Sequence, residues 1–71
     1  MTRRFYRREE LVGKEVYNIK GTRIGVVWDV TYLKDGTAAL IVSKVNRQEI
    51  IPSTEVSEVG DIVLLRSTVA R

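Results

Sequence analysis

Residues 23–33, with the sequence RIGVVWDVTYL, decide the fold. Apolar and aromatic side chains recur there at every second position. The alternating set consists of Ile24, Val26, Trp28, Val30 and Tyr32. β-branched and aromatic residues at a period of two predict a strand with these side chains on one face. Gly25 weakens a strand interior, so we expect it to mark a bulge or the close approach of another backbone.

A hairpin turn follows this strand. Residues 34–37 read Lys-Asp-Gly-Thr, and Asp-Gly suits the two central positions of a type I′ turn. Residues 38–45 then predict the returning strand. Apolar residues occur on both of its faces, which is typical of a strand that is central in its sheet or lies at an interface.

The remaining segments predict further short strands. Residues 15–19, 49–52 and 62–65 read as strands, and Pro52 must end its strand or place it at an edge. Ser53 is a candidate N-cap for about one helical turn. We therefore expect an all-β domain, a small barrel of five to six short strands with at most one or two short helical turns. Closure into a barrel would remove most strand edges.

Size and composition exclude several kinds of chemistry. The chain has 71 residues and contains neither cysteine nor histidine. Disulfides, thiolate or imidazole metal sites, cysteine nucleophiles and histidine bases are therefore excluded. The sequence predicts that the protein is not an enzyme and binds no cofactor or metal. A domain this small is marginally stable alone, which favours an efficient core or an oligomeric partner.

Positive charge is concentrated at the start of the chain. Twelve basic and nine acidic side chains give a net charge of +3. We divide the chain into a basic arm, residues 1–10, and a nearly neutral domain, residues 11–71. The arm's candidate contacts for an anionic partner, such as RNA or lipid head groups, are Arg3, Arg4, Phe5, Tyr6, Arg7 and Arg8. A solvated tail, or packing of the arm on a partner barrel, is the alternative.

Four segments in a fixed order resemble a known family. They read LVGKEVY at 11–17, GTRIGVVWDV at 21–30, IIPSTEV at 50–56 and VGDIVLL at 59–65. Together they are similar to the PRC-barrel family, which implies a small β-barrel. That family includes part of a photosynthetic reaction-centre subunit, a ribosome maturation factor and small stand-alone archaeal proteins.

The chain's length is most similar to that of the stand-alone archaeal members. The resemblance implies a protein–protein adaptor of archaeal cell division, forming a homodimer or a heterodimer with a related PRC-barrel protein. Division members contact the SepF anchor of the FtsZ ring. We expect a cytoplasmic location, because no apolar run reaches the ~18 residues of a transmembrane helix. The resemblance implies the division site as the specific place. The alternative is an RNA- or ribosome-associated maturation factor that uses the arm.

Candidate interface residues lie on strands that are apolar on both faces. A barrel has one interior, so the apolar side chains on the outward faces stay uncovered. A partner barrel would bury the outward apolar side chains of residues 38–45 and 62–65. We expect contacts at Ile41, Val45, Val63 and Leu65. Trp28 and Tyr32 are either core residues or anchors of an interface.

Overall fold

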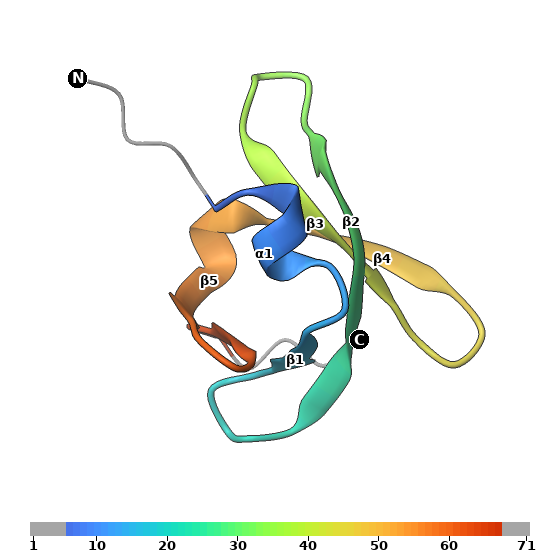
Figure 1. Cartoon of the computed structure of the whole chain (residues 1–71), viewed down its shortest axis with the longest axis vertical. Helices are drawn as coiled ribbons and strands as arrows, with labels where there is room; N and C mark the ends of the chain where they lie inside the picture. Colours follow the sequence, from blue (N-terminus) through green and yellow to red (C-terminus); the bar gives the residue numbers. More distant parts are fainter. Residues whose placement is uncertain (1–5, 68–71) are drawn as a thin grey trace.

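The computed structural model describes residues 6–67, which form one six-stranded sheet with two short helical turns (Figure 1). The strand order is β4-β3-β2-β1-β6-β5. The strands are β1 (Glu15–Tyr17), β2 (Arg23–Tyr32), β3 (Ala38–Ser43), β4 (Gln48–Pro52), β5 (Val56–Val59) and β6 (Val63–Leu65). The turns are α1 (Arg8–Leu11) and the 3-10 turn η1 (Ser53–Glu55). The predicted all-β class is confirmed, while β5 had not been predicted as a strand.

β2 is the long strand that joins the two halves of the sheet, and two bulges interrupt it. Ile24 is an extra residue opposite β1, and Trp28 is an extra residue opposite β3. Each bulge shifts the alternation of the side chains by one position. Ile24 and Val27 are consequently buried, whereas Trp28 is 61% exposed. The strict alternation predicted for residues 23–33 is therefore wrong.

Gly25 lets β3 lie close against β2. A Cβ atom at this position would overlap the Ser43 carbonyl oxygen and lie 2.8 Å from Val42 Cγ1. No larger residue fits there without moving β3. The prediction that Gly25 marks a bulge or a close approach is confirmed.

The β2–β3 turn is not of type I′. That turn requires positive φ at both central residues, but among residues 6–67 only glycines have positive φ. Gly36, with φ of 90°, donates its N–H to the Leu33 carbonyl at 2.9 Å, and Leu33 N–H bonds Thr37 O at 2.8 Å. This is a three-residue loop in which the left-handed glycine follows a tight turn.

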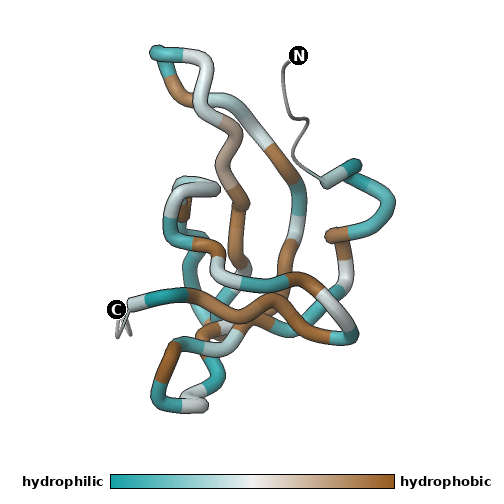
Figure 2. The backbone as a smooth tube through the Cα atoms, turned by 90° about the vertical axis from the view of Figure 1, so that its left-hand side faces the viewer, coloured by the Kyte–Doolittle hydropathy of each residue, from teal (hydrophilic) through white to brown (hydrophobic). Residues whose placement is uncertain are grey.

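The hydrophobic core lies between the two halves of the curled sheet. Buried residues from α1 and all six strands meet in it: Leu11, Val16, Ile24, Val27, Leu40, Val42, Ile51, Val56, Val63 and Leu65. Figure 2 shows the hydrophobic stretches where the strands cross, while the projecting turns are largely hydrophilic. β1 and β6 close the lower part of the core as a parallel pair, with Val16 opposite Val63.

One polar side chain, Asn18, is buried with this core at 2% exposure. Its Oδ1 accepts the N–H groups of Lys20 and Thr22, both at 2.9 Å. The backbone N–H of Asn18 donates to the Thr22 carbonyl. Asn18 therefore organises the β1–β2 turn, and its burial is offset by hydrogen bonds.

The sheet curls but does not close. β4 and β5 are the terminal strands, and they are joined only through η1, as Figure 1 shows. Pro52 ends β4 without a backbone N–H, and the chain turns away before it reaches β5. The expected barrel closure is thus incomplete, and two strand edges remain.

Candidate interaction surface

An apolar patch lies on the outward side of β2, β3 and β4. Ile41 pairs with Asp29 on one side and with Ile50 on the other. Leu40 and Ile51 point into the core, so Ile41 and Ile50 point outward, because side chains alternate along a strand. Ile50 is 54% exposed, and the bulge residue Trp28 lies next to this row. We call Trp28, Ile41 and Ile50 the outer patch.

The other exposed candidates lie outside the outer patch. Tyr32 is at the end of β2, next to the β2–β3 loop, and Val45 is in the β3–β4 turn. Both are highly exposed. The sequence predicted a strand over residues 38–45, but β3 ends at Ser43. Val45 therefore lies outside the strand. The structure thus brings Trp28 and Ile41 together but separates them from Tyr32 and Val45.

Val63 and Leu65 are not surface residues. Both have 0% exposure, and their assignment to an interface is wrong. The parallel pairing sets Val63 beside the buried Val16, and paired residues point to the same face of a sheet. The outward positions of this segment are Ile62 and Leu64 instead.

Ile50 was missed as a surface candidate. The signal was present in the sequence, since Ile50 and Ile51 are adjacent on one short strand. Adjacent strand residues face opposite sides, so one of two neighbouring isoleucines must point away from the core.

Arg7 and Arg8, at the end of the basic arm, form contacts with the folded domain. The Arg7 backbone N–H donates to Glu10 Oε1 at 2.9 Å, and Arg8 Nε lies 2.5 Å from Asp29 Oδ1. α1 therefore spans the expected boundary between the arm and the barrel. Tyr6 is 47% exposed. Arg3, Arg4 and Phe5 lie outside the described residues.

Hydrogen bonds lower the pKa of two carboxylates, Asp29 and Asp35. The hydrogen bond from the Arg8 guanidinium, followed by that from the Val30 N–H, lowers the pKa of Asp29 below its usual value. The Thr37 backbone N–H likewise lowers the pKa of Asp35 in the β2–β3 loop. Asp29 thus acts as a hydrogen-bond acceptor for Arg8 of α1 and for Val30, and Asp35 acts as an acceptor within the β2–β3 loop. A general acid would instead need a raised carboxyl pKa.

A shallow basic depression lies between the start of β2 and the β3–β4 turn. Its volume is about 550 Å³, and residues 22–26 and 43–47 line it. Arg23, Lys44 and Arg47 contribute positive charge. Lys44 lies 2.5 Å from Glu49 Oε1, and Arg23 lies 3.3 Å from Glu15 Oε2. Two of the three cations are therefore neutralised by neighbouring glutamates.

Within residues 6–67, no group of three or more acidic side chains is placed to hold a metal ion. None of the helices in this part of the chain is long and apolar enough to cross a membrane.

Comparison with known sequences identifies the fold. No curated protein is significantly similar to this chain. The sequence pattern of the PRC-barrel domain matches residues 3–71, and so covers nearly the whole chain. The match includes all six strands and both helical turns. The chain belongs to the PRC-barrel domain family.

Proposed function

We propose that this protein is a non-enzymatic adaptor that binds other proteins, as a homodimer or in a pair with a related PRC-barrel protein. The outer patch is the observation that carries the proposal. Trp28 and Ile50 expose more than half of their surface on one outward side. Contiguous exposed apolar groups of this kind mark sites of protein association, and tryptophan is enriched among the residues that dominate binding energy.

The proposal of a non-enzymatic role rests on the available side chains. The sequence provides no cysteine or histidine, and Asp29 and Asp35 are engaged by local hydrogen bonds. Asp35 stabilises the β2–β3 loop, and Asp29 stabilises the position of α1. Surface, rather than reactive groups, is what this small domain offers to its partners.

We place the adaptor in the cell-division machinery, in the cytoplasm and at the division site. This setting rests on the resemblance to stand-alone archaeal PRC-barrel proteins, and the expected partner is a SepF-like anchor of the FtsZ ring. Depletion in the native cell tests the setting. We expect delayed or misplaced septa, and normal septum formation would contradict it.

Capture of partners from the native cell tests the adaptor function itself. The tagged protein is compared with Trp28→Ala and with Tyr32→Ala, a matched control that removes an even more exposed aromatic ring outside the outer patch. We expect Trp28→Ala to lose the partners at least tenfold and Tyr32→Ala to retain them. Equal capture by all three proteins would show that the outer patch does not bind partners.

The basic depression favours a second candidate, an RNA- or ribosome-associated factor. Arg47, for which no ion pair is found within residues 6–67, would contact phosphates there, together with the arginines of the arm. Binding should then weaken steeply with salt and fall further when residues 1–8 are deleted. If the protein does not bind RNA at low salt, this candidate is excluded.

A further inference from the structure

We infer that β4 is an interface strand that pairs with β4 of a second copy, antiparallel, about a twofold axis at Ile50. The two sheets then form one continuous sheet. This inference rests on the proposed adaptor function and names one partner, the chain itself.

The hydrogen-bonding phase of β4 leaves its outer edge available. The Lys44 N–H donates to the Arg47 carbonyl at 2.8 Å, which makes this a hydrogen-bonded pair of the β3–β4 ladder. Such pairs alternate along an antiparallel ladder, so Glu49 and Ile51 bond to β3. The N–H and C=O groups of Gln48 and Ile50 therefore point away from β3, toward the open side of β4 (Figure 1).

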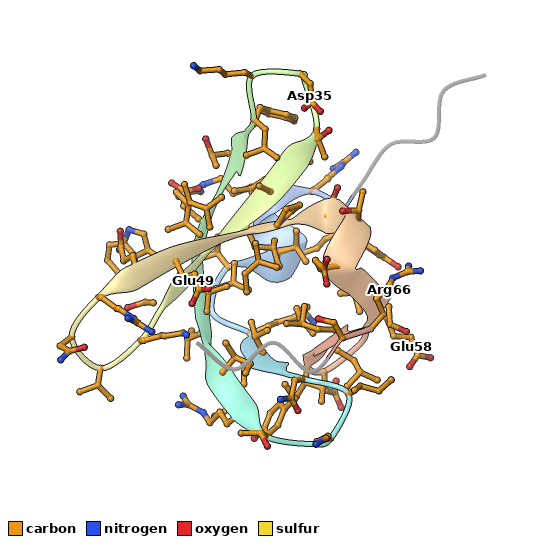
Figure 3. The ribbon with its side chains drawn as sticks, turned by 180° about the vertical axis from the view of Figure 1, so that it is seen from behind. Asp35, Glu49, Glu58 and Arg66 are labelled. Carbon is orange, nitrogen blue, oxygen red and sulfur yellow. The ribbon has the colours of Figure 1, made fainter. Side chains whose placement is uncertain are left out.

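β4 carries one of the usual devices that protect a sheet edge, Pro52 at its end, and lacks the others. Its register with β3 is unbroken from Gln48 to Pro52, without a bulge. Its one charged side chain, Glu49, is bound to Lys44 and mostly buried, and Figure 3 shows Glu49 on this strand. Natural proteins block exposed edges with bulges, outward charges, prolines or very short strands. Here Ile50, an exposed β-branched residue, occupies the centre of the edge.

A twofold pairing centred on Ile50 is self-complementary. The two Ile50 residues exchange both of their outward hydrogen bonds, and each Gln48 N–H meets the Pro52 carbonyl of the second copy. Pro52 lies at the end of the pairing, where its missing N–H costs least. The side chains of the two Ile50 residues meet directly on one face, as cross-strand neighbours.

Charge favours the same antiparallel arrangement. Arg47 precedes β4, and within residues 6–67 no ion pair is formed by its side chain. Glu55 follows β4 at the end of η1. Antiparallel pairing brings the Arg47 end of one copy to the Ser53–Glu55 end of the other, where Glu55 adds negative charge although its Oε1 is buried. A parallel arrangement would instead bring the two Arg47 residues together.

The size of this contact predicts a weak dimer. A standard interface covers ~800 Å² per partner, about a sixth of the 5108 Å² exposed by the chain. An edge of five residues covers less, so we expect dissociation constants between ~1 µM and ~1 mM. Pairing also joins the two outer patches at Ile50, which enlarges the apolar face offered to other proteins.

Amide hydrogen exchange tests the pairing residue by residue. We expect the Ile50 and Gln48 N–H groups to exchange more slowly as protein concentration rises, while Glu49 and Ile51 are protected at every concentration. Sedimentation over the same range should show the dimer forming. If the dimer forms without protecting the Ile50 N–H, it uses another surface; the inference is then overturned and the adaptor proposal survives.

Substitutions supply the second arm of the test. Ile50→Lys sets two like charges opposite each other, and Ile50→Pro removes the outward N–H without adding charge. We expect each to weaken dimerisation at least tenfold. Ile19→Lys is the matched control, since Ile19 is exposed to a similar extent, 58%, in the β1–β2 turn. Thermal melting verifies that the variants fold. A monomer at all concentrations, or equal dimerisation by Ile50→Lys and Ile19→Lys, would overturn the inference.

Discussion

The two edges of the sheet differ in how they are protected. β5 is short, carries a bulge at Ser57, and exposes the charged Glu58. The side chain of Arg66 also covers it, because its Nη2 donates to the Val56 carbonyl at 3.0 Å. The Arg66 backbone N–H donates to the Glu55 carbonyl at 2.8 Å and extends the pairing of β5 with β6. Figure 3 shows Arg66 and Glu58 on this side of the molecule. β4 has a regular register and exposes Ile50 at its centre.

The comparison separates two uses of apolar residues in one small domain. On the β5–β6 side, Val56, Val63 and Leu65 are buried in the core, and polar groups occupy the edge. On the β4 side, two adjacent isoleucines differ in burial: Ile51 lies in the core, and Ile50 is exposed. Substitutions on the first side should therefore change folding stability, and those on the second should change association.

Leu65→Ala should have the largest effect on stability. Leu65 is fully buried on β6, and its truncation leaves a cavity that costs ~2–5 kcal/mol. A domain of this size has a total stability of only ~4–10 kcal/mol. Urea unfolding measures the change. Ile50→Ala is the control on the other side, and it should alter the unfolding free energy by about 0.5 kcal/mol or less. If both variants lost the same unfolding free energy, the proposed difference between the β5–β6 side and the β4 side would be wrong.

Gly25→Ala should come next and should loosen the β4 side selectively. The added methyl group meets the Ser43 carbonyl and Val42 on β3, and overpacking of this kind costs ~1–3 kcal/mol. β4 is hydrogen-bonded to β3 at the end of the sheet. Amide exchange should therefore accelerate in β3 and β4 more than in β5 and β6. Gly60→Ala is the control, because its added Cβ meets no atom within 4 Å. Uniform acceleration across all strands would show that the two sides unfold together.

The sequence was sufficient to predict the class, the β2–β3 hairpin and the role of Gly25. It could not predict which residues of β2 face inward, because two bulges shift the alternation and bulges depend on the partner strands. The assignment of Val63 and Leu65 failed for a related reason. All four residues of 62–65 are apolar, so only the pairing with β1 decides which side is buried.

Arg66→Met tests whether the side chain of Arg66 protects the β5 edge. The substitution keeps the apolar stem but removes the hydrogen bond to the Val56 carbonyl, a loss of ~1 kcal/mol. We expect faster amide exchange in β5 with little change in β3. Arg47→Met is the control, since Arg47 lies in the turn before β4. If β5 exchange is unchanged, the bulge and Glu58 suffice to protect this edge.

Asp29→Asn should have the smallest effect, and the effect should depend on pH. α1 packs against β2, and the Arg8–Asp29 ion pair links the two elements. Because the folded-state pKa of Asp29 is lowered, its contribution is complete above the unfolded carboxyl pKa and is lost as the pH falls through the folded pKa. The melting temperatures of wild type and Asp29→Asn should therefore differ slightly at neutral pH and converge in acid. Asp61→Asn, an exposed turn substitution, is the control. A difference that persists below the folded-state pKa of Asp29, where its carboxyl is protonated, would mean that Asp29 acts through its shape or through the hydrogen bond from the Val30 N–H and not through its charge.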